Sequence, residues 1–473
     1  MENQRRVAFV TLGCKVNASE TEGMRTLFEA AGYRAVSEGE PADVCVINTC
    51  TVTNTGDQKS RQQIRRARRL NPEAIVAAVG CYVQVSPEEA AAIPGVDLVL
   101  GNNLKHRIVA LVEACMARKE ELAASTGAAA PVETPSGAPA GVETSIESRS
   151  GAPAAYVLDR RKMSGFEELP IADLHGQTRA FLKIQDGCDR FCAYCIIPYA
   201  RGPVRSRRTA DVLAEAGRLS EKGFSEMVLT GIHLTSFRDE DGQEGLMRLI
   251  EALDAMPGVA RIRLGSLEPV FLTPAFLDRL ARTDKFCPHF HLSLQSGSEG
   301  VLQRMNRRYE PDGYRTILQD IRSRFPDAAV TTDVMVGFPG ETDLEFEESL
   351  AFCRESGFAW MHVFPYSPRK GTPAASRPDQ VPKSVKEARA AAIGRLAEAM
   401  RTDFQQRMAG RTFPVVFEQP VPGKPGFMEG YTPNYIQVAV PGGPEIAGAC
   451  LPVALENPDG ERMTGSLVRP GHG

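Results

Sequence analysis

Three cysteines, Cys188, Cys192 and Cys195, lie close together in the stretch KIQDGCDRFCAYCIIPYARG. Thiolates at this spacing repel one another unless a cation neutralises them, so the spacing indicates a metal site. Zinc would take a fourth Cys or His, and none is nearby in the sequence. Three cysteines suit a 4Fe-4S cluster in which one iron stays open for a substrate or cofactor. The alternative is three unrelated thiols in one loop.

A second set of cysteines is spread along the N-terminal part of the chain. Cys14 follows the apolar run VAFVTLG, Cys50 follows VCVINT, and Cys81 follows IVAAVG. Because the carboxyl ends of parallel strands meet at one edge of a sheet, these thiols are predicted to converge and to hold a second cluster. The alternative is a chance set of buried cysteines, as predicted for Cys45, which lies inside an apolar run.

The elements that would position these cysteines follow one rhythm. From Val7 to about Met116, short apolar runs alternate with helical patterns, which predicts a parallel α/β sheet with right-handed crossovers. The alternation resumes near Thr178, and six further strand and helix units predict a barrel or partial barrel. After Gly410, short apolar runs separated by Pro and Gly predict a small antiparallel β module.

These patterns predict an α/β protein with three domains. The stretch between Ala123 and Ala155 has no aromatic residue and few aliphatic ones, so it cannot offset its ordering entropy. The predicted organisation is an N-terminal parallel-sheet cluster domain over residues 1–118, a flexible Ala/Gly/Pro/Ser-rich linker over 119–175, a partial (β/α)6 barrel over 176–402, and a small antiparallel β-barrel over 403–473.

The composition is that of a folded globular protein. The chain has 473 residues, of which 42% are hydrophobic and 24% charged, and this excludes wholesale disorder and fibrous repeats. Lys and Arg number 55 against 59 Asp and Glu, so binding to nucleic acid would depend on local basic patches. The chain shows neither an export signal nor a run of about 18 apolar residues. A cytoplasmic protein with reduced thiols and no membrane partner is expected.

The cysteine triplet at 188–195, with Tyr194 before its last cysteine, resembles the signature of radical S-adenosylmethionine (SAM) enzymes. The resemblance implies that the amine and carboxylate of SAM bind the open iron. An electron passing through the cluster then cleaves SAM to a 5′-deoxyadenosyl radical.

The words TLGCKVNASE, INTCTVT and VGCY, followed by that triplet and a small β module, resemble the methylthiotransferase family. This implies an N-terminal cluster domain, a radical SAM barrel and an RNA-binding TRAM domain. It also implies two 4Fe-4S clusters, two molecules of SAM per reaction, and an external electron donor such as flavodoxin or ferredoxin. GCKVN and the triplet words resemble the branch that adds a methylthio group to carbon 2 of threonylcarbamoyl adenosine at position 37 of tRNA. Ala18 and Ser19 depart from the expected Gln and aromatic residue.

In the radical SAM pattern, residues that follow the barrel strands contact SAM. Strand ends in such barrels form the face that holds active sites, although each residue could equally belong to an ordinary turn. The predicted SAM-binding residues are Thr230, Gly231, Ser266, Glu268, Gln295, Ser296, Gly337, Gly340 and Glu341.

Two basic stretches are candidates for contact with tRNA phosphates, although a charge run can also be a solvated helix face. They are Lys59, Arg61, Arg65, Arg66, Arg68 and Arg69, and then Arg201, Arg205, Arg207 and Arg208. Residues 401–473 carry six cations and seven acids, so the C-terminal module is not basic. Base stacking on Phe427, Tyr431 or Tyr435 would compensate for this.

Two alternatives to this reaction remain. The same chemistry could act on isopentenyl adenosine in tRNA or on an aspartate of a small-subunit ribosomal protein. The chain could instead be a non-catalytic iron-sulfur electron carrier or scaffold. A carrier, however, needs four ligands for a closed cluster, whereas this triplet leaves one iron open.

Overall fold

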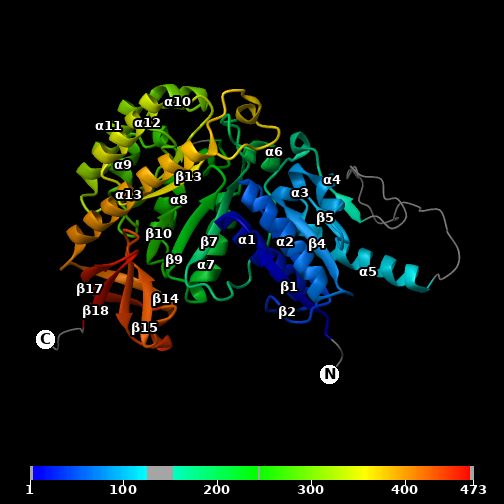
Figure 1. Ribbon diagram of the computed structural model, residues 1–473. Coiled ribbons are helices and arrows are strands. Elements are labelled where there is room, and N and C mark those ends of the chain that lie inside the picture. Colours follow the sequence, from blue (N-terminus) through cyan, green and yellow to red (C-terminus); the bar gives the residue numbers. More distant parts are fainter. Residues whose placement is uncertain (1–3, 125–152, 243–244, 469–473) are drawn as a thin grey trace. The chain divides into compact units, whose positions relative to one another are not determined.

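The structure, a computed structural model, describes residues 4–124, 153–242 and 245–468 (Figure 1). It comprises two compact units. The first contains the N-terminal residues up to His175, together with Gln185–Phe191 and Cys195–Arg207. The second contains Gly176–Ile184, Cys192–Tyr194 and the chain from Arg208 onward.

The first unit is built on a parallel sheet of six strands in the order β2-β1-β3-β4-β5-β6. Every residue of β3 and β4 is buried, as expected for central strands covered on both faces. The strands are β1 (Arg6–Thr11), β2 (Arg34–Val36), β3 (Val44–Thr49), β4 (Ile75–Gly80), β5 (Leu98–Leu100) and β6 (Ala154–Tyr156).

Helices cover both faces of this sheet. Phe28 of α1 and Ile108 of α5 share one apolar cluster with Val46, while Ile64 of α2 and Tyr82 of α3 share the other with Ile47. The result is a three-layer α/β domain, as the sequence predicts. The helices are α1 (Lys15–Ala30), α2 (Asn54–Leu70), α3 (Cys81–Val85), α4 (Pro87–Ala91), α5 (Ile108–Ala124), α6 (Ile197–Arg201), and the 3-10 turns η1 (Lys105–Arg107) and η2 (Arg160–Lys162).

The predicted linker over 119–175 is folded at both of its ends. Residues up to Ala124 continue α5, and β6 adds a sixth strand to the sheet by pairing with β5. Beyond β6, Met163, Leu169 and Ile171 are buried. Composition misses these segments because a three-residue strand is stabilised by the sheet edge it joins, not by its own sequence. Residues 125–152 lie outside the described part of the chain.

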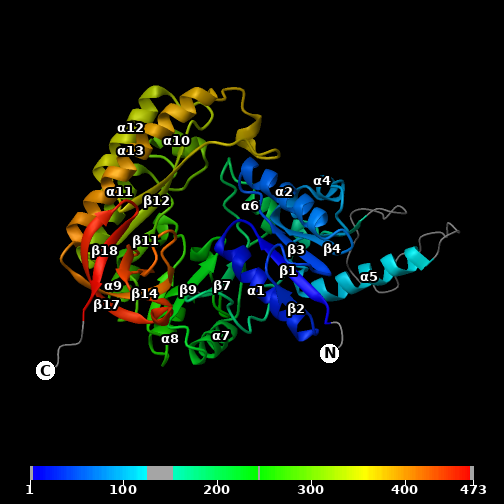
Figure 2. The same cartoon turned by 60° about the horizontal axis from the view of Figure 1, so that its bottom comes forward.

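The second unit contains the predicted partial barrel (Figure 2). Its sheets have the orders β10-β9-β7-β8 and β11-β12-β13, and bridges from Ile262 to Phe286 and from Leu267 to Leu292 join them. The strands are β7 (Ala180–Asp186), β9 (Glu226–Gly231), β10 (Arg261–Leu264), β11 (His289–His291), β12 (Ala329–Val336) and β13 (Trp360–Pro365). The last two residues of β7 pair antiparallel with the short β8 (Arg205–Ser206), and these residues belong to the first unit.

Helices alternate with these strands along the chain, which confirms the repeated βα pattern. The α-helices are α7 (Thr209–Glu221), α8 (Gly245–Asp254), α9 (Pro274–Leu280), α10 (Glu299–Arg304), α11 (Pro311–Arg324), α12 (Asp343–Ser356) and α13 (Lys383–Met408). The 3-10 turns are η3 (Leu234–Ser236), η4 (Pro269–Phe271), η5 (Pro373–Ser376) and η6 (Pro444–Ile446).

The C-terminal module is a closed barrel of five strands in the order β14-β15-β16-β18-β17. All neighbouring pairs are antiparallel except β16 and β18. One parallel pair is unavoidable, because an odd number of strands cannot alternate in direction around a closed ring. The strands are β14 (Thr412–Pro420), β15 (Phe427–Tyr431), β16 (Gln437–Pro441), β17 (Cys450–Asp459) and β18 (Arg462–Leu467).

A buried ion cluster binds this module to the larger barrel within the second unit. Glu226, at the start of β9, accepts a hydrogen bond from Arg263 at 2.7 Å and forms an ion pair with Arg261 at 2.9 Å. Arg263 also donates to the carbonyl oxygens of Pro433 (2.9 Å) and Thr432 (3.2 Å), in the turn between β15 and β16. The carboxylate of Glu226 is therefore the counter-ion shared by the arginines that hold the C-terminal turn.

Candidate functional site

Cys14, Cys50 and Cys81 lie at the carboxyl ends of three neighbouring strands, as predicted. Cys14 caps the start of α1 after β1, Cys50 directly follows β3, and Cys81 is the first residue of α3 after β4. Because β1, β3 and β4 are adjacent and parallel, their ends meet at one edge of the sheet. Cys45 instead lies buried within β3, as predicted for a structural thiol.

Neighbouring thiols affect the pKa values of Cys14 and Cys50. A Cβ placed on Gly13 would lie 2.9 Å from the Sγ atom of Cys50, so only glycine allows this approach. Desolvation by the surrounding protein raises the pKa of Cys14 and that of Cys50. Cys81 raises both pKa values further, whereas Arg201 lowers them. Arg201 is thus a cation that favours the thiolate form of both Cys14 and Cys50.

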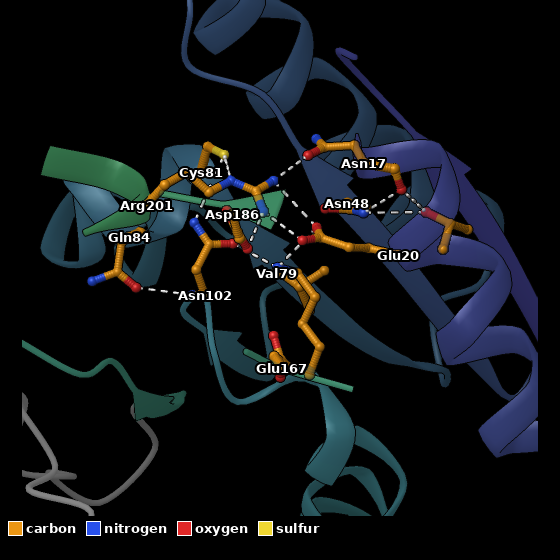
Figure 3. A network of polar contacts seen from close by, with 12 residues as sticks. Asn17, Glu20, Asn48, Val79, Cys81, Gln84, Asn102, Glu167, Asp186 and Arg201 are labelled. Atoms are coloured by element: carbon orange, nitrogen blue, oxygen red, sulfur yellow. Dashed lines mark hydrogen bonds and ion pairs between the residues drawn. The ribbon is translucent and has the colours of Figure 1, made fainter. Parts of the chain in front are cut away.

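Arg201 is fully buried at the end of α6 and donates a hydrogen bond from Nε to the Sγ atom of Cys81 at 3.1 Å (Figure 3). Its Nη2 atom donates to Asn17 at 2.6 Å and to Glu20 at 3.2 Å, while Nη1 contacts Glu20 and Asp186. Burial alone would lower the pKa of Arg201, but Cys81, Glu20 and Asp186 raise it well above its ordinary value. The guanidinium is therefore a fixed cation beside Cys81.

Polar residues behind Arg201 complete this network. Lys105 is fully buried; its Nζ atom lies 3.0 Å from a carboxylate oxygen of Glu20 and donates to the Oδ1 atom of Asn102 at 2.5 Å. Asn102 in turn donates to the Sγ atom of Cys81 at 3.7 Å and to the carbonyl of Ala200 at 2.8 Å. Cys81 thus receives two donors, both held in place by other buried groups.

The triplet Cys188, Cys192 and Cys195 lies in the segment between the end of β7 and the start of α6, also as predicted. The backbone amide of Cys188 donates to the carbonyl of Gly202 at 3.1 Å, which closes this segment on itself. Phe191 has a φ of +46°, a conformation that is strained for a bulky residue. Such strain is common where a loop must present ligands.

Cys192 also has an arginine donor. Arg307 donates to its Sγ atom at 3.3 Å and to Glu268 at 2.5 Å, and His233 lies 3.4 Å from the other oxygen of Glu268. Hydrogen bonds to thiolate ligands are among the factors that set the reduction potential of a cluster. In each cysteine set, one thiol therefore accepts a hydrogen bond from an arginine, and a carboxylate balances the charge of that arginine.

This donor chemistry fits a cluster better than it fits a single metal ion. Among the described residues, no three Cys, His, Asp or Glu side chains are placed to bind one ion. A single zinc ion needs its sulfur ligands at ~2.3 Å from one point, whereas a 4Fe-4S cluster takes each thiolate at a different iron. The three thiols of each set can therefore lie farther apart than the ligands of a single ion and still hold a cluster.

The residues predicted to bind SAM lie at the carboxyl ends of neighbouring strands of the second unit. Thr230 and Gly231 end β9, and the bridge between Gln295 and Val334 links the segment after β11 to β12. The Oε1 atom of Gln295 is buried without a hydrogen-bond partner among the described residues, and its φ is +66°. Ser266 is exposed in the loop after β10. An unpartnered amide oxygen on a strained backbone fits a ligand site.

Other members of the predicted SAM set bind protein groups instead. Glu341 accepts from the backbone amide of Gly337 at 2.8 Å and from Arg389 at 2.6 Å, so its carboxylate fixes the turn after β12. A Cβ on Gly337 would clash with Lys386, and Gly340 donates its amide to Asp379 at 2.8 Å. Ser296 shares a hydrogen bond with Ser349, at 2.9 Å. These residues shape this end of the barrel.

The basic helix α2 presents only part of its charge to solvent. Arg68 donates to backbone carbonyls and pairs with Asp97, so it is a structural residue. Arg66 pairs with Glu38, and Arg61 lies over the ring of Tyr82. Lys59, Arg65 and Arg69 are exposed outside any ion pair of the described structure, whereas the exposed Arg66 is paired.

Most of the second basic stretch is buried. Arg201, Arg205 and Arg207 are buried: Arg205 donates to the carbonyl of Arg201 and Arg207 pairs with Glu168. Arg208 is exposed but pairs with Asp211. A buried guanidinium cannot reach a phosphate, so the prediction was wrong for the first three residues. A charge run alone does not reveal which cations balance acids from distant parts of the chain.

The aromatic residues considered for base stacking are partly used within the second unit. Tyr435 stacks on His289 with ring centres 4.5 Å apart, and Tyr431 stacks on Tyr435 at 4.9 Å. Arg179 lies over the ring of Tyr431 at 4.8 Å. These contacts hold the C-terminal module against the barrel, and base stacking on Tyr431 or Tyr435 stays a prediction. Phe427 is half-buried and lies under the Lys424 ammonium group.

Sequence reasoning missed most of the network around Cys81. Asn17 and Glu20 lie one turn apart on α1, where Asn17, Ser19, Glu20, Thr21 and Glu22 are all buried. Asn17, Glu20 and Thr21 share one face of this helix, and polar residues at that spacing were the available signal. Lys105, Asn102 and Arg307 carried no comparable pattern.

In the described part of the chain, no helix has both the length and the hydropathy needed to cross a bilayer.

Two family models match this chain. Residues 6–101 match the model described as "Uncharacterized protein family UPF0004", and residues 182–353 match the Radical SAM superfamily. The first match covers the sheet edge that carries Cys14, Cys50 and Cys81, and the second covers the triplet and most of the barrel.

Curated relatives match over nearly the whole chain. Threonylcarbamoyladenosine tRNA methylthiotransferase MtaB of Bacillus subtilis (strain 168) is 38% identical over 98% of this chain and 96% of its own length. The enzyme of that name from Aquifex aeolicus (strain VF5) is 35% identical over 86% and 91%. The tRNA-2-methylthio-N(6)-dimethylallyladenosine synthase of Pelotomaculum thermopropionicum is 31% identical over 98% of both chains.

Among solved structures, the radical S-adenosylmethionine methyltransferase TsrM of Kitasatospora setae, with cobalamin and a [4Fe-4S] cluster bound, has a similar fold. Its TM-score is 0.55 at 15% identity, over 90% of this chain and 81% of that one. At this identity the likeness concerns the fold alone.

Proposed function

The chain belongs to the radical SAM methylthiotransferase family, and we propose that it adds a methylthio group to carbon 2 of threonylcarbamoyl adenosine at position 37 of tRNA. The observation that carries this proposal is the 38% identity over nearly full length to a protein named for that substrate. Cys14, Cys50 and Cys81 at one sheet edge support the chemistry, because the family requires a second cluster to supply sulfur.

In this reaction the chain's own residues position the reactants. Cys188, Cys192 and Cys195 would hold the cluster that binds SAM, and Cys14, Cys50 and Cys81 the auxiliary cluster. When bound, these groups supply an electron for the cleavage of SAM and a sulfur for transfer, chemistry that no side chain offers. Carbon 2 of adenine is an unactivated C–H position, so a general base would not serve. Arg307 and Arg201 donate to one thiol of each set.

The reductive step consumes an electron that neither SAM nor tRNA provides. We therefore include an external donor of the flavodoxin or ferredoxin class among the partners, and place the reaction in the cytoplasm, where tRNA is modified. The Oε1 atom of Gln295 is the side-chain atom best placed to accept a hydrogen bond from SAM, because it is buried without a protein partner in the described structure.

Expression of this chain in a bacterial strain that lacks its own threonylcarbamoyladenosine methylthiotransferase tests the substrate. Mass spectrometry of nucleosides from total tRNA should show the methylthio form of threonylcarbamoyl adenosine, and a strain carrying the Cys188→Ala variant should not. If the methylthio group appeared only on isopentenyl adenosine, or only on an aspartate of a small-subunit ribosomal protein, the proposed substrate would be wrong.

The exposed cations of α2 are expected to contact tRNA phosphates. Changing Lys59, Arg65 and Arg69 together to Ala should weaken tRNA binding and lower the salt dependence of log Kd by about one unit per lost contact. Binding measured across a salt series gives this slope. The matched control changes the exposed Arg279, Arg282 and Arg315 of the second unit to Ala, with the same loss of charge. An equal loss of slope in the control would mean that net charge, not α2, governs binding.

A further inference from the structure

Arg201 is buried at a high cost, which its polar surroundings offset. A guanidinium is always charged, and moving it out of water is unfavourable unless each donor finds a partner. Two carboxylates, Glu20 and Asp186, and the amide oxygen of Asn17 accept from its two terminal nitrogens. The remaining donor, Nε, points at Cys81. The sulfur of Cys81 is therefore the acceptor for the last hydrogen-bond donor of Arg201.

The backbone around Arg201 is tied to the cysteine triplet. α6 begins two residues after Cys195 and ends at Arg201, so a single short helix separates them. Gly202, the next residue, accepts the amide of Cys188. A Cβ on Gly187 would lie 1.8 Å from the carbonyl oxygen of Pro203, so the chain is closely packed here. Both ends of the triplet are thus fixed to the segment that carries Arg201.

Arg205 provides a comparison within the same segment. It is also buried, donates to the carbonyls of Arg201 and Pro203, and lies 3.5 Å from Asp186. No contact of Arg205 with a cysteine is recorded in the described structure. The two arginines share charge, burial and an acidic partner, and they differ in the hydrogen bond to Cys81.

We propose that Arg201 is a positioning residue that ties the SAM-cluster loop to the auxiliary site and, through its hydrogen bond to Cys81, raises the reduction potential of the auxiliary cluster. This inference rests on the proposed function, in which Cys81 is a cluster ligand. A donor hydrogen bond and a positive charge beside a thiolate both stabilise the reduced, more negative state. Loss of Arg201 should therefore make the auxiliary cluster harder to reduce.

The experiment isolates the auxiliary cluster in the full chain. Cys188, Cys192 and Cys195 are changed to Ala, the protein is reconstituted anaerobically, and the remaining cluster is titrated against potential while its EPR signal is followed. Arg201→Met in this background should lower the equilibrium constant for reduction about tenfold, which is about 59 mV for one electron. Arg205→Met, the matched control, should leave the potential within the error of the parent protein.

Arg201→Lys is the second variant, in case Arg201→Met binds too little iron. Arg201→Lys keeps the charge but loses the Nε donor. The reduction potential of its auxiliary cluster should therefore lie between that of the parent protein and that of Arg201→Met. If Arg201→Met cannot be measured, the potential of Arg201→Lys should lie below that of the parent. A bound cluster whose potential is unmoved in the Arg201 variants, or is moved equally by Arg205→Met, would overturn the role of Arg201 and leave the proposed function standing. A parent background without any cluster iron would overturn both.

Discussion

Replacing Cys14, Cys50 and Cys81 together by Ala is expected to abolish methylthiolation while leaving the reductive cleavage of SAM intact. Methylthiolation needs the sulfur-bearing cluster at these thiols, whereas SAM cleavage needs only the open iron at Cys188, Cys192 and Cys195. The cysteines of the first set follow the strands β1, β3 and β4, whereas those of the second set lie in the loop after β7. Anaerobic assays with dithionite, SAM and tRNA measure 5′-deoxyadenosine and the modified nucleoside in parallel.

The variant should remain folded, though less stable. Its Arg201 loses the acceptor of one buried donor, a cost of about 1–3 kcal/mol, while Glu20, Asn17 and Asp186 keep the rest of the guanidinium satisfied. Cys45→Ala, which removes a buried thiol from β3 outside the site, is the matched control and should keep both activities. A triple variant that holds its full barrel cluster yet makes no 5′-deoxyadenosine would contradict two separate sites.

Glu226→Ala is expected to destabilise the second unit by about 3–5 kcal/mol, because it leaves buried arginines without their counter-ion. The side chains of Glu226 and Arg263 are fully buried, and that of Arg261 is 6% exposed. Denaturant unfolding of the full chain measures the loss. Limited proteolysis should also show earlier cleavage near Thr432, because Arg263 holds that turn.

The control for this variant is a surface pair of the same kind. Glu251 and Arg279 are 2.7 Å apart with both side chains about half exposed, so Glu251→Ala should cost less than about 1 kcal/mol. Equal losses in the two variants would show that burial does not set the value of the Glu226 cluster.

The contribution of Glu226 should also depend on pH. Burial alone would raise its pKa, but Arg263, Arg261 and Arg179 hold the pKa below the ordinary value of a glutamate. The ionised carboxylate therefore contributes its full stability above that ordinary value and loses it as the pH falls through the lowered native pKa. Stability curves of the parent and of Glu226→Gln should converge on acidification.

The placement of the cysteines was predictable from the sequence alone. Spacing within one loop defines the triplet, and Cys14, Cys50 and Cys81 each follow a strand whose apolar run is readable without a structure. Parallel strands then bring distant residues to one edge, because every strand of such a sheet points the same way. The repeated βα units follow from the same local signals.

The roles of the arginines were decided only by the tertiary structure. Arg201 and Arg65 both stand in basic stretches of the sequence, yet Arg201 is buried on Cys81 and Arg65 is exposed on α2. The difference arises from Glu20, which lies 181 residues away from Arg201 along the chain. Local pattern reports the charge of a side chain but not its partner. A buried cation is specified by the acid that neutralises it, and that acid becomes a neighbour only when the chain has folded.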